Sequence, residues 1–375
     1  MSAKYTERPV RFGMLGVGMI CRDRLGYLPN IGTLKDKVEV VAVADIVPER
    51  ARAVAEEFGI PDSYASLDDM LAQADLDVVV NLTPIPVHAA TSLQVVQAGK
   101  HLVSEKPLAT TLAEADAIID AAREQGVTIV CAPPDALQAR YRTARNVIDR
   151  GDIGKVAFAR VRSSHAGPGG GPRGWPMDPS WFYQKGSGPL LDMGVYGIHE
   201  ITALLGPARR VVAFSGITEP TRTVRGDGPF GGTVIDVTAD DNSLFMLDFG
   251  GATFAVVDGT FNVHAAKSPK VEVFARKGAL AIHQRTESGP PLEVYRQDLQ
   301  PGVDGWDEPA NYTDADDPRE EVLHRAMLLE HMVDCLREGR TPLASAEHAR
   351  HALEIMIAVM QSSEEARVID LQTTF

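Results

Sequence analysis

Cysteine is scarce in this sequence and long apolar runs are missing. The 375 residues include three cysteines, Cys21, Cys131 and Cys335, which are odd in number and widely spaced. That spacing fits neither a disulfide framework nor a metal site, and it favours buried, reduced thiols in a cytoplasmic protein. No apolar stretch approaches the roughly 20 residues that span a bilayer, so we expect no membrane partner. The first apolar stretch, residues 10–20, carries Arg11 and three glycines, which argues against a secretory signal.

Basic residues are also in short supply. The chain has 37 Lys and Arg against 51 Asp and Glu, a net charge of −14. Such a surface repels phosphate backbones, so we expect no nucleic-acid partner. Hydrophobic residues make up 44% of the chain, which is enough for a globular core. At roughly 100–200 residues per domain, the length predicts two domains.

The first third of the chain alternates short apolar runs with helical patterns. Gly59, Gly99 and Gly126 stand just after three of the helical segments, as C-terminal caps do. This alternation predicts βαβ units and a doubly wound parallel sheet, the Rossmann α/β fold, over residues 1–132. The expected strands are 10–15, 38–44, 78–82, 101–104 and 127–131, and the expected helices are 48–58, 67–74, 87–98 and 112–125.

The pattern changes after Ala132. A helix is expected at 140–150, followed by longer β-like segments that predict a large, open, mostly antiparallel sheet. Residues 300–319 are acidic and are expected to be irregular. Two helices, with apolar spacing over 322–336 and 349–360, close the chain. We therefore expect an α+β domain over residues 133–375, whose closing helices pack back on the first domain. Its expected strands are 155–164, 209–217, 233–238, 243–249, 253–263, 271–276 and 279–283.

A glycine turn follows the first expected strand. It provides the first two glycines of G-x-G-x-x-G, with Cys21 in place of the third. Between a strand and a helix, such a turn leaves backbone N–H groups free to hold a pyrophosphate. The alternative is a turn with no ligand. The expected cofactor contacts in this segment are Gly16, Val17, Gly18, Met19 and Ile20.

Asp45 ends the second expected strand, where an acidic side chain accepts hydrogen bonds from the adenine ribose. The next residue, Ile46, cannot pair with a 2′-phosphate, and the carboxylate would repel one, so NAD is favoured over NADP. Arg50 offers a route by which NADP would still bind. The alternative role for Asp45 is a helix cap before Pro48.

Three further segments, together with the glycine turn and Asp45, resemble the Gfo/Idh/MocA family of NAD(P)-dependent sugar and inositol oxidoreductases. The resemblance implies a Rossmann domain that binds NAD or NADP, a sugar or polyol substrate held at the domain cleft, and an open C-terminal sheet that often forms homodimers or homotetramers. The three segments are Thr83-Pro84-Ile85-Pro86-Val87-His88, AGKHLVSEKP from Ala98 to Pro107, and GSGPLLDMGVYGIH from Gly186 to His199.

The resemblance assigns roles to individual residues. Lys106 matches the family's catalytic lysine, and Asp192 and Tyr196 match its catalytic positions in the second domain. Two departures affect expected contacts: Ile85 replaces the usual Asn, and residues 132–135 replace an Arg-Phe segment. The residues implied to line the nicotinamide side are Thr83, Pro84, His88, Glu105 and Lys106.

These side chains suit hydride transfer to or from an alcohol. The Lys106 ammonium would stabilise an alkoxide or, with a lowered pKa, take its proton. Tyr196 would relay that proton, and Asp192 would fix neighbouring substrate hydroxyls. His199, three residues after Tyr196 on an expected helix, would contact substrate or share the relay. Each residue also has a non-catalytic alternative. Lys106 would be a surface lysine and Tyr196 a core tyrosine. Asp192 would be a helix cap and His199 a core histidine.

His165, Trp175 and Trp181 are the remaining expected substrate contacts, since aromatic faces with scattered donors suit a sugar ring. A loop fixed by buried aromatic side chains would look the same. No residue spacing resembles a metal site. The function expected first is a dehydrogenase or reductase of carbohydrate alcohols. The alternatives are an NAD-dependent glycosidase that works by transient oxidation and elimination, and a non-catalytic sensor of cofactor or sugar.

Overall fold

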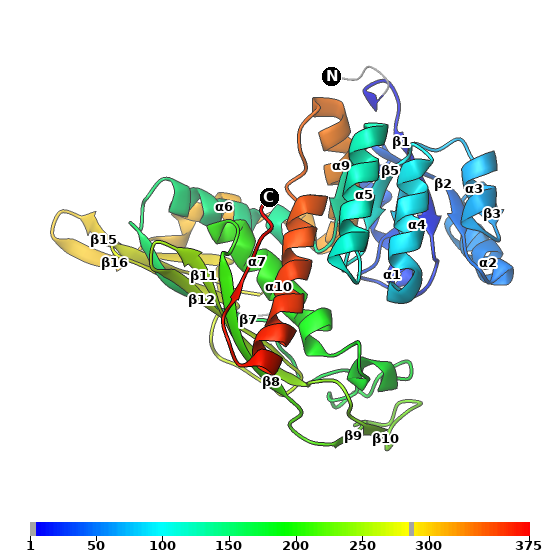
Figure 1. Ribbon diagram of the computed structural model, residues 1–375. Helices are drawn as coiled ribbons and strands as arrows, with labels where there is room; N and C mark the ends of the chain where they lie inside the picture. Colours follow the sequence, from blue (N-terminus) through cyan, green and yellow to red (C-terminus); the bar gives the residue numbers. More distant parts are fainter. Residues whose placement is uncertain (1–4, 285–288) are drawn as a thin grey trace. The chain divides into compact units, whose positions relative to one another are not determined.

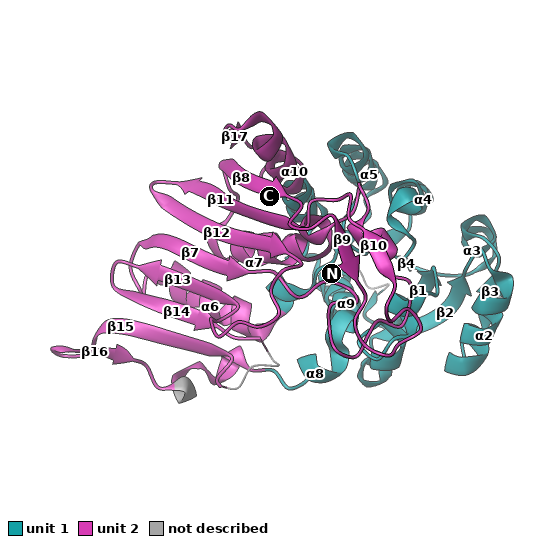
Figure 2. Cartoon of the chain, turned by 90° about the horizontal axis from the view of Figure 1, so that it is seen from below, with its two compact units in different colours: residues 1–137, 317–353 teal, residues 138–316, 354–375 magenta. Residues whose placement is uncertain are grey.

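The computed structural model describes residues 5–284 and 289–375, and the chain divides into two compact units (Figure 1). Unit 1 comprises residues 1–137 and 317–353, and unit 2 comprises residues 138–316 and 354–375, as coloured in Figure 2. In the described part of the chain, no helix has the length and apolar character needed to cross a membrane.

Unit 1 is built on a parallel sheet. Its strand order is β3-β2-β1-β4-β5-β6, and every neighbouring pair runs parallel. The expected doubly wound sheet is thereby confirmed. Strand β3 was not expected, because it is an edge strand of three residues with no buried side chain. The strands are β1 (Val10–Leu15), β2 (Val38–Ala44), β3 (Asp62–Tyr64), β4 (Val78–Asn81), β5 (His101–Ser104) and β6 (Ile129–Cys131).

The helices of unit 1 begin and end at local signals that the sequence carries. Gly59 and Gly126 adopt φ values of +67° and +66° as left-handed C-caps of α2 and α5. At the start of α5, Thr111 and Glu114 form a capping box. The helices are α1 (Met19–Arg22), α2 (Pro48–Phe58), α3 (Leu67–Gln73), α4 (Ile85–Gln97) and α5 (Leu112–Gln125).

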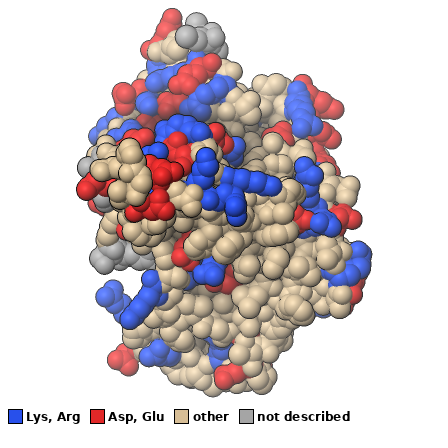
Figure 3. All heavy atoms as spheres, turned by 90° about the vertical axis from the view of Figure 1, so that its left-hand side faces the viewer, with Lys and Arg blue, Asp and Glu red and all other residues tan. Residues whose placement is uncertain are grey.

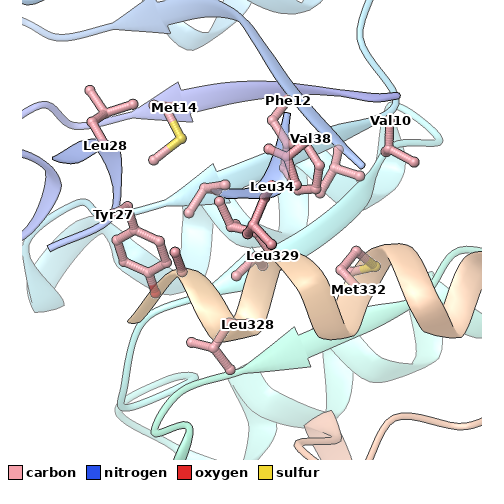
Figure 4. Close-up of a cluster of buried hydrophobic side chains, with 14 of the residues drawn as sticks. Val10, Phe12, Met14, Tyr27, Leu28, Leu34, Val38, Leu328, Leu329 and Met332 are labelled. Carbon is pink, nitrogen blue, oxygen red and sulfur yellow. The ribbon is translucent and has the colours of Figure 1, made fainter. Parts of the chain in front are cut away.

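A segment from near the end of the chain completes the core of unit 1. Helix α9 (Met327–Glu338) packs beside β1 and β2, and Figure 4 shows its Leu329 and Met332 near Phe12 and Val38. The expectation of a single closing helix over 322–336 is wrong in one respect. The helix is interrupted between α8 (Glu320–Leu323) and α9 by a 3-10 turn over residues 324–326, where His324 has a φ of +44°.

Unit 2 is built on a larger sheet with the strand order β16-β15-β14-β13-β7-β12-β11-β8-β17 among the described residues. All neighbouring strands are antiparallel except β7 and β12, so the expected mostly antiparallel sheet is confirmed. The strands are β7 (Val156–Arg162), β8 (Arg210–Gly216), β11 (Asn242–Gly250), β12 (Thr253–Thr260), β13 (Val271–Ala275), β14 (Gly278–Ile282), β15 (Leu292–Gln300), β16 (Val303–Trp306) and β17 (Ile369–Asp370).

Two expectations for unit 2 are wrong. The segment 233–238 does not join the large sheet, because β10 (Val234–Asp236) pairs with β9 (Thr221–Thr223) as a separate hairpin. Residues 300–319 are not irregular throughout, because β16 pairs with β15 at the sheet edge and a 3-10 segment follows at Pro309–Ala315. An edge hairpin exposes most of its side chains, so its apolar alternation is weak.

The large sheet buries one face and exposes the other. Helices α6 (Ala139–Asp149) and α7 (Val195–Leu205) pack against it, and the last helix is α10 (Ala346–Glu365). Strand register places Met246 opposite Val256, and Phe254 opposite Phe158, on the exposed face. Figure 3 shows a broad uncharged area in the lower half of the side formed by this sheet. We call the following exposed side chains the open sheet face: Phe158, Phe214, Leu244, Met246, Phe254 and Val256.

Candidate active site

The glycine turn after β1 leaves room for a ligand. Gly16 has a φ of +84°, and a Cβ there would lie 3.0 Å from the carbonyl oxygen of Leu82, so the backbone itself requires glycine. A Cβ on Gly18 would meet nothing within 4 Å. Local packing therefore explains Gly16 and leaves Gly18 unexplained, which favours close approach of a pyrophosphate over a turn with no ligand.

The residue that replaces the third glycine faces the core. Cys21 lies in α1, which is a single turn, and it is fully buried in the apolar cluster of unit 1. Burial raises the pKa of its thiol to about 12. A small apolar side chain thus takes the packing role of the third glycine. Cys21, Cys131 and Cys335 are all buried free thiols, which confirms the expected burial of unpaired cysteines.

Asp45 ties the end of β2 to the glycine turn. One carboxylate oxygen accepts the Val17 N–H at 3.0 Å, and the other accepts the Val47 N–H at 2.9 Å. The N-cap of α2 is Val47, so Asp45 is not the helix cap. A carboxylate has about four acceptor sites, so these two bonds leave capacity for ribose hydroxyls. Beside it Ile46 is 91% exposed, and Arg50 Nη1 lies 3.4 Å from Asp45 Oδ1.

His88 lies behind the ends of β4 and β5 and braces them. Its Nδ1 is 3.1 Å from the Thr83 carbonyl oxygen, and its Nε2 is 2.9 Å from Ser104 Oγ and 3.1 Å from the Glu105 carbonyl oxygen. Burial lowers the pKa of His88, so the ring is neutral at pH 7. The ring is only 3% exposed, and its contacts position Thr83 and Glu105.

Asn81, the last residue of β4, has a similar bracing role that the sequence analysis missed. Its amide donates to Ser92 Oγ at 2.9 Å, and its carbonyl accepts from the Thr83 N–H at 3.1 Å. Asn81 is completely buried, so these bonds fix the start of the Thr83-Pro84 segment. A single Asn at a strand end carries no sequence signal that identifies this role.

Lys106 follows β5 and stands beside a braced carboxylate. Glu105 Oε1 accepts from the Tyr27 hydroxyl at 3.0 Å and lies 3.4 Å from Arg325 Nε, and Glu105 Oε2 accepts from the Lys106 N–H at 3.3 Å. Burial, together with the Glu105 charge, raises the pKa of Tyr27, so its hydroxyl remains a donor. Tyr27 and Arg325 lie far from Glu105 in sequence, which is why the motif did not reveal them.

In unit 2, Asp192 lies on a π-helical turn, Leu190–Gly194, a conformation that often occurs at functional sites. The N-cap of α7 is Gly194, so Asp192 is not that helix's cap. His165 Nε2 is 3.9 Å from Asp192 Oδ2. Since His165 Nδ1 accepts the Gly167 N–H at 2.8 Å, the proton of a neutral His165 sits on Nε2, the nitrogen nearer to Asp192.

Tyr196 and His199 share α7, as expected. Tyr196 is half-buried and His199 is 5% exposed. This burial is compatible with a packing role in the core as well as with a catalytic role for either residue. Ser163, which the sequence analysis missed, holds the start of this helix. Its hydroxyl donates to the Met193 carbonyl oxygen and accepts the Gly197 N–H at 3.0 Å. A Cβ on Gly197 would lie 2.8 Å from the Ser163 Cβ, so only glycine allows this approach.

The two tryptophans differ in environment. Trp175 packs edge-on against Phe182, with ring centroids 6.2 Å apart, and joins a buried apolar cluster. Trp175 therefore fits the alternative of a side chain that fixes the loop by packing. Trp181 is 48% exposed, and its ring lies over Phe182 at 3.9 Å. Trp181 therefore has a face available to a ligand. In the described ranges, no group of three or more His, Cys, Asp or Glu side chains gathers in an arrangement suited to a metal ion.

Comparison with known proteins gives matches to both parts of the chain. Residues 10–132 match the profile of the oxidoreductase family with an NAD-binding Rossmann fold, GFO_IDH_MocA, and residues 141–281 match the GFO/IDH/MocA C-terminal domain. The sequence is 30% identical over 261 residues to levoglucosan dehydrogenase of Pseudarthrobacter phenanthrenivorans, an alignment that spans 64% of each protein. This stretch is a little under two thirds of the relative's length.

Two further likenesses extend over almost the whole chain. The sequence is 25% identical to scyllo-inositol 2-dehydrogenase (NAD(+)) of Bacillus subtilis, with 97% of each protein aligned. A solved structure of levoglucosan dehydrogenase in complex with NADH superposes with a TM-score of 0.80 at 22% identity, over 98% of this chain and 100% of that one. At that identity the structural likeness shows a shared fold.

Proposed function

Because this chain belongs to the Gfo/Idh/MocA oxidoreductase family, we propose that it transfers a hydride between NAD and a secondary alcohol of a sugar, glycoside or polyol. The observation that carries the proposal is the Glu105–Lys106 pair at the carboxyl end of β5. Glu105 is held by Tyr27 and Arg325, and it accepts the Lys106 N–H. In doubly wound sheets that end of the strands is where ligands bind.

The chain offers a fitting set of groups for NAD. The open space in front of Gly18 accommodates a pyrophosphate, and the N–H groups of the turn from Gly16 to Ile20 are the donors for it. Asp45 retains acceptor sites for the ribose hydroxyls. The neighbouring Ile46 offers nothing to a 2′-phosphate, which favours NAD, whereas Arg50 is the residue through which NADP would bind. Thr83 and Pro84 precede α4 on the proposed nicotinamide side, where NAD supplies the hydride acceptor.

The proton of the alcohol is assigned to side chains of this protein. Lys106 carries the positive charge that stabilises a developing alkoxide, and Tyr196 relays the proton. Asp192 and His165 hold substrate hydroxyls, a role supported by the distance of 3.9 Å between them. His199 contacts substrate from the same helix as Tyr196. An intact acid–base set of this kind favours an enzyme over a non-catalytic sensor.

The experiment is a screen of free sugars, glycosides and inositols with NAD and with NADP, followed by the absorbance of the reduced cofactor. A dehydrogenase gives net NADH with at least one alcohol. A glycosidase that oxidises and then re-reduces its sugar gives a released aglycone with no net NADH. Absence of both products with every compound would contradict the proposal.

We also propose that the open sheet face joins two copies of this chain. Phe214 is 82% exposed, Leu244 lies opposite it in register, and Phe158 stacks on Phe274 with ring centroids 4.6 Å apart. A continuous apolar face of this kind marks a protein interface. Light scattering should give a homodimer or homotetramer, and Met246→Glu should dissociate it. A wild-type monomer would contradict this. The buried free thiols support a cytoplasmic location.

A further inference from the structure

Unit 2 contains a cavity that none of the roles above uses. It measures about 420 Å³ and lies between the loop after His165 and the β9–β10 hairpin. Small-molecule sites span about 300–1,000 Å³, so the cavity has the size of a ligand site. Its lining includes Ala166, Tyr183, Thr223, Arg222 and Asn262.

The cavity adjoins the proposed substrate contacts of unit 2. Ala166, which lines it, is the residue after His165. The His165 ring lies over Phe261 with centroids 5.3 Å apart, and Phe261 meets Tyr183 edge-on at 5.4 Å. Tyr183 lines the cavity, and burial raises the pKa of its phenol, so its hydroxyl stays protonated. Two buried rings, Phe261 and Tyr183, thus connect the His165 ring with the wall of the cavity, and the chain that follows His165 forms part of that wall.

The walls of the cavity are fixed by buried contacts. Arg222 donates to the Ala166 carbonyl oxygen at 3.1 Å and lies 3.3 Å from Asp241 Oδ2, and Asp241 is 1% exposed. The guanidinium also stands 5.5 Å from the centre of the Tyr183 ring. These bonds connect the hairpin to the loop that carries His165. The cavity is therefore built into the fold and does not depend on a ligand to form it.

The chemistry of the lining suits an uncharged, hydroxyl-rich group. Arg222 is paired with Asp241, and the lining also carries one further arginine, Arg225, and one carboxylate, Glu219. Thr218, Thr221 and Thr223 carry hydroxyls that can donate and accept hydrogen bonds, as sugar hydroxyls do. The Asn262 amide already has partners on both its oxygen and its nitrogen. The apolar part of the wall is formed by Tyr183, Val224 and Ile235, and His264 also lines the cavity. With Asp241 counted beside Arg222, two arginines stand against two carboxylates, so the cavity lacks the net positive charge that a phosphate or carboxylate would need.

We propose that this cavity binds a second, neutral sugar ring, so that the substrate is a disaccharide or longer glycoside and not a free monosaccharide. The inference rests on the proposed function, since it takes His165 and Asp192 as the contacts of the ring that reacts. It adds a subsite for the neighbouring ring, formed by the β9–β10 hairpin and the loop after His165.

The test compares cellobiose, maltose, lactose and trehalose with glucose and galactose, using kcat/KM with NAD. At least one disaccharide should exceed its own monosaccharides by about tenfold or more, the equivalent of 1.4 kcal/mol of additional binding. Thr223→Trp fills the cavity and should remove that advantage while leaving the monosaccharide values unchanged. Thr233→Trp adds the same bulk to an exposed residue outside the cavity and should change neither.

Three kinetic results would each overturn the proposal. One is equal kcat/KM for every disaccharide and its monosaccharides, and another is an advantage that survives Thr223→Trp. The third is a preference for glucuronate or glucose 6-phosphate over all four disaccharides. Calorimetry with the same sugars separates this inference from the proposed function. Disaccharide binding that only Thr223→Trp abolishes, without any NADH formed, would support the subsite and reject the dehydrogenase, whereas no binding at all would reject the subsite.

Discussion

Removal of one hydroxyl group at Tyr27 should lower turnover although Tyr27 lies outside every motif in the sequence. Tyr27 is completely buried and donates to Glu105 Oε1 at 3.0 Å. Glu105 in turn accepts the Lys106 N–H at 3.3 Å. Tyr27→Phe keeps the ring and its packing, so the change acts through the orientation of Glu105 and of Lys106 beside it.

The size of the effect follows from the bond that is lost. A hydrogen bond to a charged acceptor contributes about 1.5–3 kcal/mol. Because Arg325 Nε still lies 3.4 Å from the same oxygen, we expect the lower part of that range. If the whole loss were expressed in the transition state, kcat would fall roughly 10- to 30-fold, and partial expression gives a fall of about threefold. The NAD dissociation constant should stay within about twofold, since the turn at Gly16 and Gly18 is untouched.

Tyr5→Phe is the matched control. The Tyr5 hydroxyl lies 3.0 Å from His101 Nε2, at the opposite end of the same strand, β5. Both variants should lose stability in thermal unfolding, but only Tyr27→Phe should lower kcat. The pH profile of kcat should keep its shape, because the raised pKa of Tyr27 leaves it protonated throughout. Wild-type kcat in Tyr27→Phe, or an equal fall in Tyr5→Phe, would refute the positioning role.

Three further predictions test other parts of the site and the fold. Asp45→Ala should raise the KM for NAD about tenfold or more with little change for NADP, while Ile46→Ala leaves the KM for NAD unchanged; an unchanged KM for NAD in Asp45→Ala would remove the ribose role. Tyr196→Phe should lower kcat with little change in substrate KM, and His199→Asn should mainly raise substrate KM; the reverse pattern would exchange their roles. Burial, with the neighbouring His351, lowers the pKa of His348 from 6.5 to about 3, so the unfolded chain binds one more proton there once the pH falls below about 6.5. The free energy of unfolding should therefore fall with decreasing pH, and His348→Gln should reduce that slope by up to about 1.4 kcal/mol per pH unit in urea titrations; an unreduced slope would contradict the neutral buried ring.

The sequence predicted the elements whose limits depend on local chemistry. Strands β1 and β2 are mostly apolar, with one charged residue each, and α2 and α5 end at glycines that adopt left-handed φ values. Elements stabilised by their neighbours were harder to predict. β3 has no buried side chain, and β15 and β16 form an edge hairpin that buries only two of its side chains.

The residues of the candidate site also fall into two groups, those that the sequence predicted and those that it did not. Gly16, Asp45 and Lys106 belong to motifs whose spacing in the chain reflects their chemistry. Tyr27 and Ser163 do not, because each acts through a hydrogen bond to a segment distant in sequence. The bracing role of His88 became visible only from its contacts with Ser104 and Glu105, since the family resemblance alone assigned it to the cofactor surface.

The most direct test of the central claim is Lys106→Met, with turnover and NAD affinity measured on the same preparation. Methionine has a similar length and apolar volume, so packing should lose about 1 kcal/mol or less. Loss of the charge and of the proton route should reduce kcat by at least about 100-fold with the best substrate of the screen. NAD affinity in calorimetry should change little, because the proposed pyrophosphate and ribose contacts are at the glycine turn and Asp45. A Lys106→Met protein that forms NADH at a rate near that of the wild type would contradict the catalytic assignment and the mechanism built on it.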